Sequence, residues 1–344
     1  MKKNTFKILL YYPIIIALIF FLINCKDNNK KNNKAKVTTY SKNITSIPEF
    51  NKDSAYYYLK TQVDFGPRYL GSKGWQNCAA YLEQTLKRFA DTVITQNIIV
   101  RTFTGQTFKA KNFIASYNPH EQKRILLAAH WDTRPFADKD PDISNHNKPI
   151  LGANDGASGV AVLLEIARIL SNNKINIGID IILFDAEDYG VSDDKKNIKN
   201  ADYTWGLGSQ YWAKNPHSPG YTAEYGILLD MVGSYNPLFA KEAFSLKYAA
   251  DIVNKVWNIA ASLGYASIFS DKITGYIMDD HYFVNTIRGI PMIDIIHHDT
   301  STPSGFMPQW HTLKDNIDII DKNTLEIVGK TLLVVIWDEN NITL

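Results

Sequence analysis

The spacing of apolar residues along the chain predicts helices and strands that alternate over most of its length. Apolar side chains recur three and four positions apart, as on one face of a helix, in residues 54–63, 72–89, 154–170, 248–263 and 323–337. We expect Asn154 or Asp155 to cap the third of these helices. Short runs rich in Ile, Val, Leu and Phe predict strands at residues 92–100, 106–117, 125–129, 179–184, 227–231 and 291–296.

The last four of these strands differ from the first two, because they are short apolar runs of the kind that helices cover on both faces. The first two are more typical of strands at the edge of a sheet. We therefore predict one α/β domain, in which a central, mostly parallel, twisted sheet is flanked by helices. In sheets of this kind, ligands bind at the carboxyl ends of the strands.

The beginning of the chain has the pattern of an export signal. Three lysines precede an apolar run at residues 8–23, which is shorter than the roughly 20 residues of a membrane-spanning helix and fits a secretory signal. The run ends in Leu-Ile-Asn-Cys, which resembles a bacterial lipobox, in which the cysteine (here Cys25) is lipidated. We expect a protein exported to the bacterial cell envelope and anchored there by lipid, with a plain signal anchor as the alternative.

These patterns divide the chain into three parts. Residues 1–25 are the expected lipoprotein signal peptide, residues 26–46 a flexible tether rich in Lys and Asn, and residues 47–344 the folded domain. We expect the domain to be a monomer. If Cys25 carries lipid, then Cys78, the other cysteine of the chain, has no disulfide partner and is best explained as a small buried residue.

Charge argues against nucleic acid as a partner. The formal net charge of the chain is +2, but residues 1–36 contain eight Lys and one Asp, so the remaining residues have a formal charge of −5. A protein that binds nucleic acid needs a basic face on its folded part. We therefore expect no binding of nucleic acid, and contact with a membrane only through the N-terminal anchor.

Carboxylates and a histidine follow the predicted buried strands. His130 and Asp132 follow the strand at 125–129, and Asp155 opens the next helix. The later strands and segments supply the rest, namely Glu187, Asp188, Asp230, Asp279 and His311. Each alone has an ordinary explanation, such as a helix cap or a solvated loop. Together, buried acids at one sheet edge repel each other unless a cation or hydrogen bonds compensate, and mixed nitrogen and oxygen ligands favour catalytic zinc.

The order of these residues resembles that of the zinc aminopeptidase-like superfamily. Within it, the segments Asp-Asp-His-Tyr-Phe at 279–283, Arg-Gly-Ile-Pro at 288–291 and Phe-Met-Pro-Gln-Trp-His-Thr-Leu-Lys-Asp-Asn at 306–316 are similar to the glutaminyl-peptide cyclotransferases. The resemblance extends over residues 50–340. It implies conversion of the N-terminal glutamine of peptides or proteins to pyroglutamate, with release of ammonia.

The resemblance also implies roles for individual residues. One zinc ion would be bound by Asp155, Asp188 and His311, and Glu187 would be the general acid and base. Asp230 and Asp279 would handle protons, sharing a hydrogen bond. The walls of the substrate pocket would be Trp310, Phe306 and Trp205.

Two other functions fit the sequence. A two-zinc aminopeptidase would use His130 and Asp230 as further ligands and Asp155 as the bridge between its metals, and every position that it needs is filled. Asp279 in its Asp-Asp-His context and Trp310 directly before His311 favour the cyclotransferase. The third possibility is a non-catalytic surface lipoprotein that uses the fold for binding, which the complete set of ligands and Glu187 disfavours.

Overall fold

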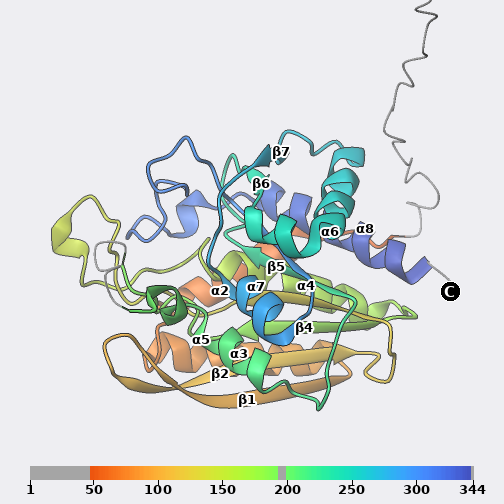
Figure 1. The fold of residues 1–344 in the computed structure, drawn as a ribbon, viewed down its shortest axis with the longest axis horizontal. Coiled ribbons are helices and arrows are strands. Elements are labelled where there is room, and N and C mark those ends of the chain that lie inside the picture. The colour runs from red at the N-terminus through yellow and green to blue at the C-terminus, as the bar shows by residue number, and fades with distance from the viewer. Residues whose placement is uncertain (1–46, 193–198, 342–344) are drawn as a thin grey trace, which may run out of the picture. The chain divides into compact units, whose positions relative to one another are not determined.

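A computed structural model describes residues 47–192 and 199–341 (Figure 1). The predicted signal peptide, lipidated Cys25 and tether lie outside these residues and stay predictions. Within the described residues, six strands form the main sheet, in the order β1-β2-β4-β3-β5-β8. Their bounds are β1 Thr92–Arg101, β2 Thr107–Tyr117, β3 Arg124–His130, β4 Gly178–Phe184, β5 Tyr225–Asp230 and β8 Met292–Ile296.

The sheet has a parallel part and an antiparallel edge. Strands β4, β3, β5 and β8 pair in parallel, whereas β1 pairs with β2, and β2 with β4, in the antiparallel sense. Every residue of β3, β4, β5 and β8 is buried. The predicted mostly parallel sheet is thus present, and the two strands expected at an edge form one.

Helices cover both faces of the sheet. The helices are α2 Lys52–Asp64, α3 Lys73–Phe89, α4 Ala157–Asn172, α5 Leu207–Lys214, α6 Ala243–Ser262, α7 Asp280–Phe283 and α8 Lys322–Asn341. Helices α2, α3 and α8 pack against α4, which packs on the central strands. On the other face, Leu126, Ile182 and Leu228, from three neighbouring strands, form a core with Trp212 of α5. Successive side chains of a strand point to opposite faces of the sheet, so the buried strands contribute to a core on each face.

The chain that links β5 to β8 forms a smaller substructure. It contains α6, α7 and a pair of short parallel strands, β6 Phe239–Lys241 and β7 Phe269–Ile273. A π-helical turn, Val284–Arg288, follows α7. Among the described residues, no helix combines the length and the apolar character that crossing a membrane requires.

The structure corrects the predicted start of helix α4. Helix α4 begins at Ala157, and Gly156, which has no side chain to cap it, holds the N-cap position with φ 97°. The prediction that Asn154 or Asp155 caps this helix was therefore wrong. A Cβ atom at Gly156 would lie 2.5 Å from the carbonyl oxygen of Asp132, so only glycine fits here. The turn leaves the Asp155 carboxylate free to face His130.

Candidate functional site

The predicted acids and histidines gather at the carboxyl ends of the parallel strands. His130 is the last residue of β3 and Asp230 the last of β5, while Glu187 and Asp188 lie in the turn after β4. Asp155 reaches the same edge from the turn before α4. Parallel strands place their carboxyl ends side by side, which explains why residues so distant in the sequence meet here.

The backbone is strained at several residues near the carboxyl ends of the parallel strands. Three non-glycine residues have left-handed φ angles beside or at these positions, namely Ala186 at 58°, Met231 at 49° and His311 at 54°. Such conformations persist only where the surrounding structure enforces them, and they concentrate at functional sites. At each of the three positions the backbone turns sharply next to a predicted site side chain.

Asp155, Asp188 and His311 form one group that could hold a metal ion. One potential ligand atom from each lies within 4.8 Å of the other two, and all three residues are buried. The His311 Nε2 atom is 3.2 Å from Asp188 Oδ1 and 3.5 Å from Asp155 Oδ2. Asp188 Oδ2 is buried without a hydrogen-bond partner in the described structure. A buried carboxylate oxygen in that position is costly unless a cation or a proton satisfies it.

His130, Asp155 and Asp230 form a second such group. His130 Nε2 lies 3.1 Å from Asp155 Oδ1 and 3.1 Å from Asp230 Oδ1. Asp155 therefore contacts both histidines, one through each carboxylate oxygen. This is the arrangement expected of a carboxylate that bridges two metal ions, so the residues present leave the number of ions open.

Residues behind these groups hold the turn after β4 in place. The Asp132 carboxylate accepts hydrogen bonds from the backbone N–H groups of Glu187, at 3.0 Å, and Asp188, at 3.2 Å. Asp315 likewise accepts from the N–H groups of Asn154 and Asp155. Both carboxylates fix the backbone from which the site side chains project.

Arg134 connects several parts of the site and was not anticipated from the sequence. Its buried guanidinium forms a bidentate salt bridge with Asp138, at 2.6 and 2.8 Å, and lies 3.4 Å from Asp188 Oδ1. Asp138 Oδ1 is in turn 3.4 Å from Nδ1 of His311. The sequence held a signal for this pair, since Arg134 closely follows the His-x-Asp motif and Asp138 lies four positions further on.

Burial changes the acidity of the carboxyl groups. Burial, followed by the charge of Asp279, raises the pKa of Glu187 well above its usual range. Burial raises the pKa of Asp230 to about 7. A carboxyl group whose pKa is raised keeps its proton at higher pH than an exposed carboxyl group does, which suits a general acid or base.

Asp279 lies among a further set of acids. Its side chain caps α7 by accepting from the Asp280 N–H at 2.5 Å, and it clusters with His281 and Asp294. Asp230 Oδ1 pairs with Nε2 of His130 at 3.1 Å. The predicted hydrogen bond between Asp230 and Asp279 stays a prediction.

The three predicted aromatic residues surround His311. The Trp310 ring stacks on the His311 ring with 3.8 Å between centroids, and Trp205 stacks on it at 6.1 Å with an interplanar angle of 13°. Phe306 packs against Trp310 at 4.6 Å. The fold therefore brings together the three aromatic residues that were predicted from the sequence. Their roles toward a substrate stay predictions. The arrangement offers metal ligands, a buried carboxylic acid and an aromatic wall within one site.

Comparisons with known proteins agree with this arrangement. The model of the peptidase family M28 matches residues 112–336. The glutaminyl-peptide cyclotransferase of Gloydius blomhoffii is 25% identical over 305 residues, which cover 80% of this chain and 78% of that protein. Among solved structures, glutaminyl cyclase from Bacteroides thetaiotaomicron, bound to N-acetylhistamine, is 51% identical with a TM-score of 0.82, covering 85% of this chain and 99% of that one.

A Zn-dependent exopeptidase from Parabacteroides distasonis is similarly close, with 49% identity and a TM-score of 0.83, covering 85% of this chain and 100% of that one. The names of these relatives thus include both cyclases and exopeptidases, the two enzyme classes that the site geometry allows. The family match extends from β2 to α8 and includes the proposed metal ligands. The chain therefore belongs to peptidase family M28 and, within it, to the glutaminyl cyclases.

Proposed function

We propose that the protein is a glutaminyl-peptide cyclotransferase, which converts the N-terminal glutamine of peptides or proteins to pyroglutamate and releases ammonia. The observation that carries this proposal is the position of His311, whose ring stacks with those of Trp310 and Trp205 and which contacts Asp155 and Asp188. An aromatic pocket directly at a metal-binding group suits a short, planar amide side chain. The similarity to glutaminyl cyclases supports the same conclusion.

Zinc is the metal that the donor set fits best. One imidazole nitrogen and two carboxylate oxygens are the ligands typical of a catalytic zinc site with an open position. Asp155, Asp188 and His311 would hold the ion. When bound, zinc supplies a Lewis acid that polarises the amide carbonyl and stabilises the negative charge that develops on its oxygen. We expect one ion in the cyclotransferase.

The reaction moves one proton between two nitrogen atoms. The α-amino nitrogen forms a bond to the side-chain amide carbon, and the bond from that carbon to the amide nitrogen breaks, so that ammonia leaves. Glu187 accepts the proton of the attacking amine and donates it to the leaving nitrogen, a task that its raised pKa suits. Asp230 and Asp279 are both buried. In this proposal their carboxyl groups handle protons together with Glu187.

The aromatic residues contribute by holding the substrate. Trp310, Phe306 and Trp205 would enclose the glutamine side chain and keep it folded toward its own amine. Because the two reacting groups belong to one molecule, fixing their orientation supplies a large part of the rate enhancement. The same walls exclude water from the amide, which disfavours hydrolysis to glutamate.

The proposed setting of the enzyme is the bacterial cell envelope. The lysines and apolar run at residues 2–23, together with Cys25, support export and lipid anchoring. A monomeric domain on the Lys- and Asn-rich tether would act on exported peptides and proteins that begin with glutamine. Lipid anchoring is tested by mass spectrometry of the membrane-extracted protein, where the account expects an acylated N-terminal Cys25 and no residues before it.

A two-zinc aminopeptidase is the second candidate. The specific observation in its favour is the group of His130, Asp155 and Asp230, with Asp155 shared between both groups. In that enzyme, Glu187 would activate water instead of shuttling the amine proton. Trp310, stacked on His311 and packed against Phe306, narrows the site in a way that a peptidase accepting varied side chains does not require.

Release of ammonia tests the proposed function. The full-length protein is incubated with the peptide Gln-Ala-Ala-Ala-Ala-amide, and ammonia is measured by a coupled enzymatic assay. We expect steady release that stops after treatment with a zinc chelator and returns when zinc is added. Release that persists undiminished in the metal-depleted protein would contradict the proposed role of zinc.

Asp138 offers a test of how His311 is positioned. Because its carboxylate lies between Arg134 and the Nδ1 atom of His311, we expect Asp138→Asn to weaken zinc binding by about 10- to 100-fold, the usual effect of removing such a partner. Zinc affinity is measured by competition with a chelating dye. Asp142→Asn, in the exposed part of the same loop, is the matched control. Equal affinities in both variants would exclude this role.

A further inference from the structure

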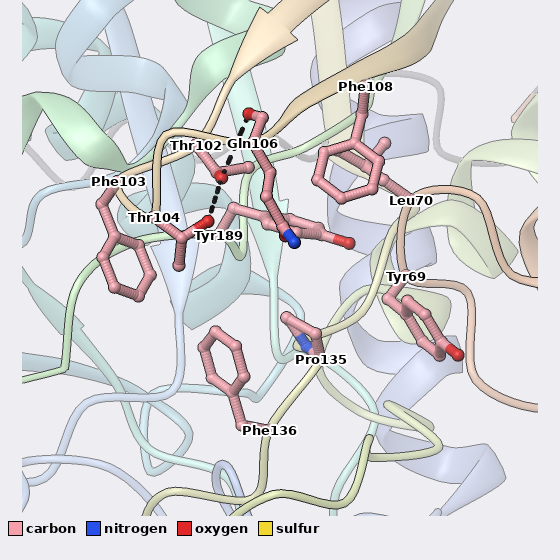
Figure 2. A pocket seen from close by; sticks show the side chains of 10 residues that line it. All are labelled: Tyr69, Leu70, Thr102, Phe103, Thr104, Gln106, Phe108, Pro135, Phe136 and Tyr189. Carbon is pink, nitrogen blue, oxygen red and sulfur yellow. Dashed lines mark hydrogen bonds between the residues drawn. The ribbon is translucent and has the colours of Figure 1, made fainter.

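A second cavity lies beside the site and has no part in the proposed reaction. It has a volume of about 170 Å³, and five of its ten lining residues are aromatic. Figure 2 shows the rings of Phe103 and Phe136 on one side and those of Tyr69 and Phe108 on the other, with Tyr189 between them. The full lining is Tyr69, Leu70, Thr102, Phe103, Thr104, Gln106, Phe108, Pro135, Phe136 and Tyr189.

Two threonines and the backbone of Gln106 bond to each other at one edge of this cavity. Thr102 Oγ1 lies 2.8 Å from Thr104 Oγ1, and the Thr102 N–H donates to the Gln106 carbonyl oxygen at 2.9 Å, which closes the turn between β1 and β2. The lining consists mainly of rings and aliphatic carbon, and its other polar groups are the Gln106 amide and the hydroxyls of Tyr69 and Tyr189. Its natural ligand is an apolar group, and a dry apolar cavity of roughly 150 Å³ is large enough for one benzene ring.

A row of stacked side chains joins the cavity to the metal-binding group. The Arg134 guanidinium carbon lies 4.8 Å from the Trp205 ring centroid and 4.9 Å from that of Phe136. Trp205 in turn stacks on His311 at 6.1 Å. At about 3.3 Å per residue, extended peptide covers this row in at most about five residues. In addition, Tyr189 directly follows the proposed ligand Asp188.

A hollow on the surface borders the aromatic cavity and extends toward Trp310. It has a volume of about 430 Å³, shares Phe103 and Phe136 with the aromatic cavity, and extends to Asp138 and Lys139. The Lys139 ammonium lies 5.5 Å from the ring centroid of Trp310, the proposed wall of the glutamine pocket. A peptide that leaves this pocket therefore finds a hollowed surface that leads to the aromatic cavity.

We propose that the aromatic cavity binds an apolar side chain, preferably aromatic, at the third, fourth or fifth residue of the substrate peptide. This inference rests on the proposed function, because it needs a peptide whose N-terminal glutamine lies at the metal-binding group. It adds a preference for substrate sequence that the glutamine pocket alone does not provide. The occupant is the substrate itself, since the cavity has room for one side chain and lies within reach of an extended peptide from His311.

A positional scan tests the inference. The parent peptide is Gln-Ala-Ala-Ala-Ala-amide, and three relatives carry a single Phe at position 3, 4 or 5. With the full-length protein, kcat/KM from ammonia release is expected to rise about tenfold for one of these peptides, as burial of an aromatic ring allows. The rise should be seen mainly in KM, because the cavity does not touch the reacting atoms.

Variants assign the preference to the cavity. Phe108→Ala is expected to reduce the ratio of kcat/KM between the preferred peptide and the parent to below about twofold, and Phe103→Ala, in the turn, is expected to lower it as well. Ile99→Ala is the matched control, because Ile99 is an exposed apolar residue on the same hairpin, outside the cavity. It should leave both the ratio and the parent rate unchanged, and thermal melting verifies that all three variants are folded.

Each result decides the inference. Equal kcat/KM for all four peptides, or a preference that both Phe variants retain, would overturn it. A preference that fades as the enzyme concentration rises would place a second copy of the chain in the cavity instead. Failure of the proposed function has a different signature, namely no ammonia from the parent peptide, and it would remove this inference as well.

Discussion

Replacing Glu187 with Gln is expected to lower kcat for ammonia release by about 10²- to 10⁴-fold, the usual contribution of a general acid and base. Glutamine has nearly the same shape as glutamate but cannot accept the proton of the attacking amine. The substituted side chain is not among the proposed metal ligands, so zinc content should stay at the level of the unmodified protein. Steady-state kinetics and elemental analysis of the same preparation measure the two quantities.

Glu224→Gln is the control for this variant. Glu224 is an exposed residue next to the start of β5, at the opposite end of the strand from the site, and its loss should leave both rate and zinc content unchanged. A near-normal rate in the Glu187 variant would remove Glu187 from the mechanism. A large loss of zinc in that variant would instead make it part of the metal site.

Replacing His311 with Ala is expected to deplete the protein of zinc. His311 supplies the one nitrogen of the group it forms with Asp155 and Asp188, and the substitution leaves two buried carboxylates with a weaker hold on the ion. We expect affinity to fall by more than the 10- to 100-fold typical of residues that only support a ligand. Elemental analysis after dialysis measures the zinc that remains, and activity should fall with it.

His120→Ala provides the matched comparison, because His120 is an exposed histidine in the turn between β2 and β3. This variant should keep its zinc and its rate. If the His311 variant retained stoichiometric zinc after dialysis, the proposed ligand set would be wrong. The ion would then have to be held by the group of His130, Asp155 and Asp230.

The parts of the site that the sequence predicted share one physical cause. Strands β3, β4 and β5 are so apolar that their positions and their parallel pairing follow from pattern alone. The residues that directly follow them must therefore meet at one sheet edge. This is why His130, Asp188 and Asp230 could be placed together without coordinates.

Contacts between loops could not be predicted from the apolar pattern of the sequence. The salt bridge of Arg134 with Asp138 and its contact with Asp188 depend on the path of two loops, which no periodic pattern encodes. The start of α4 was misplaced for a related reason. A side chain such as that of Asp155 can cap a helix or face a site, and the left-handed turn at Gly156 decides between them.

The sequence pattern failed to predict secondary structure where the elements are short or irregular. Strands β6 and β7 have only a few residues each, and β7 is largely exposed, so neither has the apolar run that marks a buried strand. Helix α6 begins at Ala243, before the predicted residue 248, and Ala249 inside it has non-helical dihedral angles. Strands β3, β4 and β5 were predicted because every one of their residues is buried.

The most direct test of the central claim is a competition between two peptides. Gln-Phe-Ala and Leu-Phe-Ala are incubated together with the full-length protein and zinc, and their masses are followed with time. We expect the glutamine peptide to lose one ammonia while the leucine peptide stays intact. Release of free leucine, with the glutamine peptide uncyclised, would contradict it and assign the site of Asp155, Asp188 and His311 to an aminopeptidase.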